Sequence, residues 1–219
     1  SFEVPFEKYD TKPLIISDSF NHPEDKLDLC WEWNHNPQVG CWSFTERPGY
    51  LRLRSTSLAK DILTARNTLT QRTSGPRCAF TVELDTEGMN PGDYAGLVAL
   101  QGNYGMIGVM ADENGLKRVV VSKRDCEGNQ KDEMYLPFPG TRIFLKIEFD
   151  FEDSIDTASF YFSIDGSQWR PLGTNLKMTY TLDLFIGYRI GIFYYSQKQA
   201  GGVADFRNFR YISEETAQF

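Results

Sequence analysis

The stretch Phe162–Leu172, FSIDGSQWRPL, places Asp165-Gly166 between two apolar runs. Asp-Gly is typical of a tight hairpin turn in which both central residues take positive φ. The dipeptide therefore predicts a β-hairpin and an antiparallel sheet around it. The preceding segments agree, because Arg142–Phe151 (RIFLKIEFDF) and Ala158–Asp165 (ASFYFSID) alternate apolar and polar residues, as half-buried strands do.

Most of the chain repeats this pattern, with Gly, Pro, Asn and Asp between the runs. No segment keeps a helical period for more than two turns, and Ser57–Ala65 predicts at most one short helix. YAGLVALQG, MIGVMA, LKRVVVSK and GYRIGIFYY alternate less and are typical of central strands. The sequence therefore predicts an all-β, two-sheet antiparallel β-sandwich of jelly-roll type over 14–213, with an N-terminal arm at 1–13 and a C-terminal tail at 214–219.

The composition is that of a globular domain. The 219 residues are 41% hydrophobic and 24% charged, and no apolar run approaches the ~18 residues of a membrane-spanning helix. The net charge of −7 argues against nucleic-acid or anionic-membrane partners, which need a cationic surface. The chain begins at Ser1 without Met or a signal peptide, as expected of a domain excised from a longer protein.

The four cysteines do not have the spacing of a zinc site. Cys30, Cys41, Cys78 and Cys126 form no CxxC pair, and His22 and His35 are the only histidines. A bridge between Cys30 and Cys41 and a fully reduced set of buried thiols both remain open.

Several long strings resemble one family. They are DSFNHPEDKLDLCWEWNHNP (18–37), WSFTERPGYLRLRS (42–55), ARNTLTQRTSGP (65–76), AGLVALQGNYGMIGV (95–109), FSIDGSQWRPLG (162–173) and FIGYRIGIFYYSQKQAGGVADFRNF (185–209). The chain resembles the C-terminal concanavalin-like β-sandwich that accompanies the catalytic propeller of family 43 glycoside hydrolases, the β-xylosidase and α-L-arabinofuranosidase group.

The resemblance implies a concanavalin A-like jelly roll without catalytic residues of its own. Its expected partners are the N-terminal catalytic propeller domain of the parent chain and a plant-cell-wall polysaccharide or oligosaccharide. The expected role is binding of xylan or arabinoxylan, shaping of the propeller's active pocket, or both. A sandwich that binds another protein and no sugar is an alternative.

Carboxylates at alternate positions of FTVELDTEGM (80–89) offer an enzymatic alternative. Glu83, Asp85 and Glu87 fit the E-x-D-x-E pattern of family 16 glucanases, in which two Glu residues are catalytic, so a free-standing hydrolase would use Glu83 and Glu87. The following GMNPGD predicts that the strand ends near Thr86 and leaves Glu87 in a turn. Apolar residues alternate with this row, so we expect it to face solvent.

Aromatic rings and planar polar groups predict the sugar contacts. Sugars are held by aromatic faces against their C–H surfaces and by amide or guanidinium groups on their hydroxyls. CWEWNHNP, ARNTLTQR, LQGNYG and GYRIGIFYY combine these groups. The candidate ligand-binding residues are Trp33, Asn36, Arg66, Asn67, Gln71, Gln101, Tyr104, Tyr188, Arg189 and Tyr194.

A structural Ca²⁺ ion is the one cofactor that the sequence suggests. Sandwiches of this general class often join their terminal strands through calcium, which prefers six to eight oxygen ligands. Asp18, Gly49 and Asp205 stand where such ligands would be. The acidic run Asp150–Asp156 lacks the spacing of an EF-hand loop and predicts a solvated hairpin loop.

Overall fold

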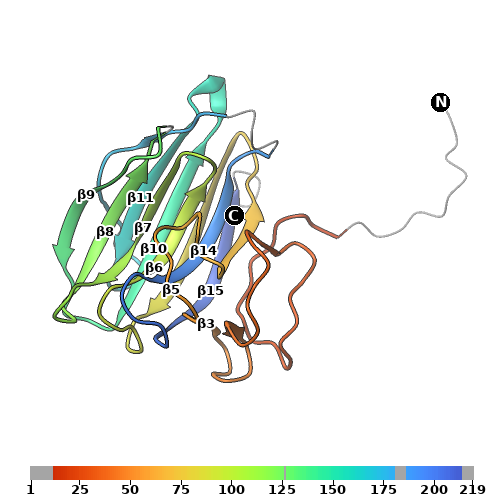
Figure 1. Ribbon diagram of the computed structural model, residues 1–219. Coiled ribbons are helices and arrows are strands. Elements are labelled where there is room, and N and C mark those ends of the chain that lie inside the picture. The colour runs from red at the N-terminus through yellow and green to blue at the C-terminus, as the bar shows by residue number, and fades with distance from the viewer. Residues whose placement is uncertain (1–11, 126, 181–185, 214–219) are drawn as a thin grey trace, which may run out of the picture.

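Two antiparallel sheets pack face to face in the computed structural model, which describes residues 12–125, 127–180 and 186–213 (Figure 1). The predicted all-β sandwich is confirmed. Most of the predicted arm at 1–13 and the whole predicted tail at 214–219 lie outside the described residues, as does Cys126. Cys30, Cys41 and Cys78 are free thiols. In the described part of the chain, no helix is long and apolar enough to cross a membrane.

The first sheet has seven strands within the described residues. In spatial order they are β1 (Glu32–Trp33), β4 (Thr68–Arg72), β14 (Arg189–Ser196), β6 (Asp93–Leu100), β7 (Tyr104–Ala111), β8 (Lys117–Arg124) and β9 (Gln130–Pro137). β14, β6 and β7 are central, as their apolar sequences predict.

The second sheet has eight strands within the same described ranges. In spatial order they are β12 (Arg170–Pro171), β11 (Thr157–Ser163), β10 (Arg142–Asp150), β5 (Arg77–Asp85), β15 (Val203–Ser213), β3 (Leu51–Arg54) and β2 (Trp42–Ser43), and β13 (Leu176–Lys177) pairs with β11. The acidic run contains the short 3-10 helix η1 (Glu152–Ser154) and connects β10 to β11, so the predicted hairpin loop is confirmed.

The core lies between the two sheets and follows the alternation of the strands. In β10, Ile143, Leu145, Ile147 and Phe149 are buried, whereas the residues between them are more exposed. These side chains join one continuous apolar cluster with the inward residues of β6 and β7. Burial of each large apolar side chain contributes about 1.5–3 kcal/mol to folding.

The predicted hairpin is present, but its turn is wider than expected. Phe162 pairs with Arg170, so residues 164–169 form the loop between β11 and β12. Gly166 takes a φ of +76°, whereas Asp165 is not among the residues with positive φ. Asp165 Oδ1 instead accepts hydrogen bonds of 2.8 Å from the backbone N–H groups of Ser167 and Gln168. The prediction of a tight turn with Asp165 and Gly166 at its centre was therefore wrong, because these hydrogen bonds stabilise a longer loop.

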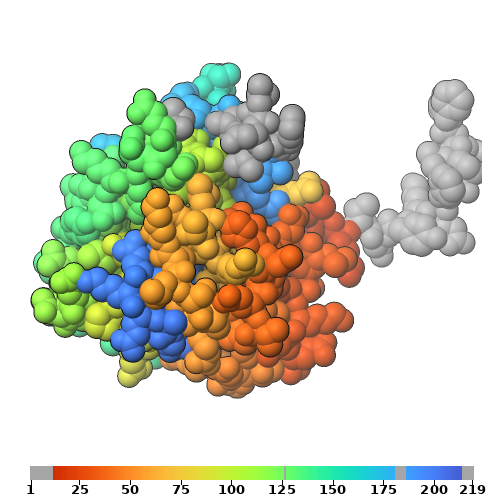
Figure 2. Space-filling model, viewed as in Figure 1, coloured from red at the N-terminus to blue at the C-terminus, as the bar shows by residue number. Residues whose placement is uncertain are grey.

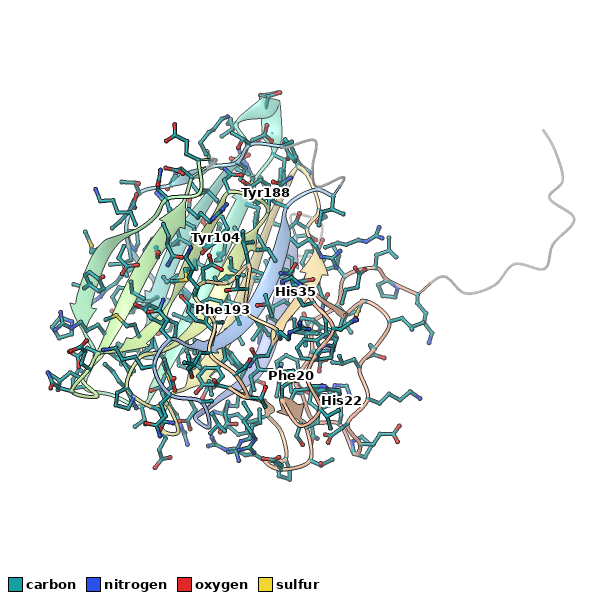
Figure 3. All side chains as sticks on the ribbon, in the orientation of Figure 1. Phe20, His22, His35, Tyr104, Tyr188 and Phe193 are labelled. Carbon is teal, nitrogen blue, oxygen red and sulfur yellow. The ribbon has the colours of Figure 1, made fainter. Side chains whose placement is uncertain are left out.

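A segment at 55–67, here called the covering segment, lies on the outward face of the seven-stranded sheet (Figure 2, orange). Ala59, Ile62 and Ala65 pack there against rings of β7 and β14, including Tyr104 and Phe193 (Figure 3). The predicted short helix is a turn at 62–64. The central strands are thus buried on both faces, which explains why their sequences show little polar alternation.

Candidate functional site

Six of the ten predicted ligand contacts are buried, namely Asn67, Gln71, Gln101, Tyr104, Tyr188 and Tyr194. Their polar atoms have partners within the domain. Gln71 accepts the backbone N–H of Ile16 at 2.9 Å, and Asn67 donates to the carbonyl of Arg54 at 2.9 Å. The Gln71 amide thus holds the N-terminal segment to β4, and the Asn67 amide holds the covering segment to β3. As ligand contacts they stay predictions, but none of them lies open to a ligand in this structure.

The three buried tyrosines likewise hydrogen-bond to the protein. Tyr104 donates to Gln130 at 2.6 Å, and Tyr194 donates to the Asp93 carboxylate at 2.5 Å. Tyr188 donates to the Asn103 carbonyl at 3.0 Å, and burial raises its pKa to about 12. Their hydroxyl groups therefore stay protonated donors that join segments distant in the sequence.

The four accessible candidates gather along β1, β4 and β14, at one edge of the seven-stranded sheet. Trp33 is half-buried and lies 5.8 Å from Trp42, ring to ring. Arg66 is exposed and donates to the carbonyl of Asn36 at 3.3 Å. Asn36 and Arg66 thus lie together just before β4, and Arg189 lies beside the other end of that strand.

The other end of β4 forms a hollow of about 310 Å³, here called the edge hollow. It is lined by Arg72, Thr73, Ile186, Gly187, Tyr188 and Arg189. The Tyr188 ring is buried, so this residue exposes little of its side chain to the hollow. Its position is labelled in Figure 3. The exposed side chain of Arg72 lies on the same face of β4 as that of Thr70, as the alternation of strand residues predicts.

Arg189 is held by two partners and has one nitrogen free. Its Nε donates to Thr70 Oγ1 at 2.9 Å, and its Nη1 lies 2.9 Å from Glu32. Its Nη2 is enclosed and meets no acceptor among the described residues. The guanidinium that a ligand in the edge hollow reaches is therefore that of exposed Arg72, which suits a ligand that offers oxygen acceptors.

The predicted calcium ligands do not form an oxygen-lined site. Asp205 pairs with Arg47 at 2.6 Å and Arg52 at 2.8 Å. Asp18 accepts hydrogen bonds from the Phe20 backbone at 2.7 Å and the Trp31 indole at 3.1 Å. Gly49 occupies a turn with a φ of +82°. No group of three or more His, Cys, Asp or Glu residues that could hold a metal occurs in the described part of the chain.

The carboxylate row does not face solvent, which corrects the sequence interpretation. Glu83 and Asp85 are only 4% and 3% exposed. Glu83 pairs with Arg207 at 2.7 Å, and Asp85 pairs with Arg47 at 2.9 Å. Arginines distant in sequence lie over this strand, so an alternation typical of an exposed face conceals buried ion pairs. β5 ends at Asp85, and exposed Glu87 lies in the following turn, as predicted.

Environment lowers the pKa of Asp85. Burial alone would raise it, but the Glu87 backbone N–H, the Arg47 guanidinium and the charge of Arg142 outweigh that effect. Asp85 is therefore a stable anion within a salt-bridge network, which differs from the raised pKa of a catalytic carboxylic acid.

Comparison with known proteins identifies the fold's family. The family model "Beta xylosidase C-terminal Concanavalin A-like domain" matches residues 17–212. The chain belongs to this family. A beta-xylosidase of Formosa agariphila is 28% identical over 96% of this chain and 37% of its own length.

Two solved structures support this membership. A bifunctional GH43-CE protein of Bacteroides eggerthii has a TM-score of 0.88 and 39% identity, over 92% of this chain and 26% of that chain. A GH43 glycoside hydrolase engineered to display both endo-xylanase and exo-arabinofuranosidase activity has a TM-score of 0.83 and 30% identity, over 96% and 44%. The chain thus spans less than half the length of each of these relatives, as an accessory domain does.

Proposed function

We propose that this domain binds xylan- or arabinoxylan-type carbohydrate for a longer family 43 glycoside hydrolase and helps to shape the active pocket of that enzyme's propeller. The observation that carries the proposal is the edge hollow, where exposed Arg72 lies beside the fixed guanidinium of Arg189. Guanidinium groups donate to sugar hydroxyls, and an uncharged polysaccharide suits a chain of net charge −7.

The accessible candidates define a path for an extended ligand. Asn36 and Arg66 lie near one end of β4, and Arg72 and Arg189 lie near the other end. Thr68 and Arg72 begin and end this strand, whose length of roughly 13 Å is the minimum separation of the two groups along it. Half-buried Trp33 on neighbouring β1 packs against the core on the other face of the sheet, so it does not belong to this path. An oligosaccharide chain could contact both groups at once.

Apolar side chains near the N-terminus support a role beside a second domain. Leu29 and Val39 are 93% and 102% exposed, and Leu14 is 65% exposed. Contiguous exposed aliphatic groups are typical of contact surfaces, whereas single ones are common on any protein, so these three residues are the positions at which the proposed contact is probed. The preceding domain of the parent enzyme is the proposed partner, and this contact would fix the edge hollow relative to the active pocket.

We propose further that the chain is not itself catalytic. Retaining glycoside hydrolysis uses two carboxyl groups about 5–5.5 Å apart, one of them an acid with a raised pKa. Glu83 is instead paired with Arg207, and Glu87 lies beyond the end of the strand. The expected result is no hydrolysis of aryl xylosides or β-glucans by the 219-residue chain. Turnover that disappears in Glu83→Gln would restore the family 16-like alternative.

Calcium binding stays a separate prediction of the sequence. The arginine and N–H donors around Asp205 and Asp18 do not fit a hard cation that needs oxygen ligands. A ligand that binds only the native state must raise the melting temperature. The same melting temperature in chelator and in added calcium would reject the prediction.

Calorimetry with xylohexaose and arabinoxylan tests the binding role. Arg72→Ala should weaken binding about tenfold, because one charged hydrogen bond is lost. Arg170→Ala is the matched control, since Arg170 is also exposed but lies on the other sheet. Equal affinities of the two variants would reject the edge hollow. In the full-length parent enzyme, a raised KM for Arg72→Ala with an unchanged kcat would support pocket shaping.

A further inference from the structure

A second hollow, of about 530 Å³, lies on the eight-stranded sheet and is here called the sheet hollow. Its volume is within the range of roughly 300–1,000 Å³ that small-ligand sites occupy. Small side chains form its floor, because Ala79 and Ser159 flank Glu148 on the two neighbouring strands. Thr157 lies in the next row, and Ile212 of β15 pairs with Ala79 at the side.

Larger side chains occupy the next row of the same sheet. Lys146, one row beyond Glu148, lies 4.4 Å from the centre of the Tyr161 ring and 5.0 Å from the centre of the Trp169 ring. These two cation–π contacts are themselves stabilising. The hollow lies over the row of small residues and not over this row of large side chains, so its place follows from side-chain size and register.

The charges at the sheet hollow are compensated. The Glu148 carboxylate lies 2.6 Å from Lys146 Nζ, and the Asp150 carboxylate lies 3.1 Å from Arg77 Nε. Each carboxylate therefore already has a cationic partner. A charged ligand would have to compete with one of these pairs, whereas an uncharged ligand can accept or donate hydrogen bonds beside them.

Hydrogen-bonding and apolar groups are both available in the hollow. The side chains of Thr157 and Asn175 form no hydrogen bond with any other described part of the chain. Both carry a donor and an acceptor, as sugar hydroxyls do. Ile155 and Ile212 are 44% and 40% exposed and form apolar walls. This combination suits a ligand whose surface alternates C–H and O–H groups.

We propose that the sheet hollow binds one or two units of an uncharged saccharide. Thr157 and Asn175 hydrogen-bond its hydroxyls, and Ile155 and Ile212 contact its C–H faces. The hollow is distinct from the edge hollow, which lies on the other sheet. The domain would then contact polysaccharide on two faces, and two linked weak sites bind one chain more tightly than either alone if the chain reaches both.

Isoleucine-methyl NMR of the 219-residue chain separates the two sites. Ile155 and Ile212 report on the sheet hollow, and Ile186 reports on the edge hollow. Each resonance is followed during titration with xylohexaose, cellohexaose and, as a charged control, a galacturonate oligomer. The expected result is a saturable shift of Ile155 and Ile212 with a neutral oligosaccharide and none with the charged oligomer.

A pair of matched variants completes the test. Ile212→Asp places a charge in the wall and should weaken binding at the sheet hollow about tenfold. Ile164→Asp is the control, because Ile164 is an exposed isoleucine in the loop at 164–169 and does not line this hollow. Absence of shifts at Ile155 and Ile212 with both neutral probes, or equal binding by the two variants, overturns the proposal. A shift of Ile186 alone would overturn it while supporting the edge hollow.

Discussion

Parts of the outward faces of the two sheets are buried, and by different means. On the seven-stranded sheet, the covering segment places Ile62 against rings such as Tyr104 and Phe193, and the contact is apolar. On the eight-stranded sheet, arginines bury Glu83 and Asp85, and the contact is ionic. Apolar burial is stabilising in itself, whereas buried ion pairs roughly balance their desolvation and are strongly destabilising only when one partner is removed. The two faces should therefore respond differently to substitution.

The largest effect is expected in the covering segment. Ile62 is fully buried, so Ile62→Ala removes apolar contacts and leaves a cavity. We expect a loss of about 3 kcal/mol in the free energy of unfolding, measured by urea denaturation. Leu58→Ala is the control, since Leu58 in the same segment is 56% exposed and should change stability by less than about 0.5 kcal/mol. Equal losses would mean that the segment does not stabilise the sheet.

The next effect is expected in the ionic network. Arg47 contacts both Asp85 and Asp205, so Arg47→Ala leaves two buried carboxylates with fewer partners. We expect a loss of about 2 kcal/mol, below the value for a fully enclosed pair because Arg47 retains 27% exposure and Arg52 still contacts Asp205.

The double variant Arg47→Ala/Asp85→Asn tests whether the effect of Arg47 on stability is ionic. Removal of both partners should be less destabilising than the sum of the two single losses, because no buried charge is left unpaired at that contact. Additive losses measured by the same denaturation would contradict an ionic origin and would assign the effect of Arg47 to packing against Tyr50, whose ring it covers at 4.0 Å.

Two buried aspartates should give opposite pH dependences. The pKa of Asp85 is lowered, so its contribution to stability is present above the unfolded value of about 4 and is lost as the pH falls through the folded value. Burial raises the pKa of Asp93, which receives hydrogen bonds from Ser196, Tyr194 and Asn90 but no cation. The folded state thus holds that proton more tightly, and stability falls as the pH rises from about 4 through the folded value.

Urea denaturation between pH 3 and 7 checks both signs. Relative to the native chain, Asp85→Asn should lose the part of the stability that falls on acidification, and Asp93→Asn should lose the part that falls as the pH rises. If stability depended on pH in the same way in the two variants, the opposite pKa shifts of Asp85 and Asp93 would be contradicted.

Much of the fold could be predicted because alternation is a local signal. β10 and β11 followed directly from their sequences, and the end of β5 followed from the Gly and Pro residues after Asp85. The burial of Glu83 could not be predicted in this way. Its partner Arg207 is distant in the chain, so the same alternating pattern describes an exposed row and a row covered by ion pairs.

The candidate site was predictable only in part, for a related reason. Amide and aromatic residues were predicted as ligand contacts, but Gln71 and Tyr104 use their polar atoms within the domain. Sequence shows which side chains can hydrogen-bond and not which bonds are already made. The sheet hollow was missed because its floor consists of small residues such as Ala79 and Ser159, whose only signal is their register on neighbouring strands.

The smallest effect is expected within β4, where two threonines share the outward face. Thr68 and Thr70 are both buried. Thr70 Oγ1 donates to the Glu32 carbonyl at 2.9 Å and accepts from Arg189 Nε at 2.9 Å, whereas Thr68 Oγ1 has no partner among the described residues. Valine has nearly the same shape as threonine, so each Thr→Val substitution removes only the hydroxyl.

Thr70→Val should therefore lower the free energy of unfolding by about 1–2 kcal/mol, because it leaves a carbonyl and a guanidinium N–H without a partner. Thr68→Val should leave it unchanged or raise it by up to about 1 kcal/mol, because a buried hydroxyl without a hydrogen bond is unfavourable. Urea denaturation of both variants measures the difference at constant shape. An equal loss at both positions would mean that the Thr68 hydroxyl has a hydrogen-bond partner, such as a bound water. Water would then reach the outward face of β4 beneath its covering side chains.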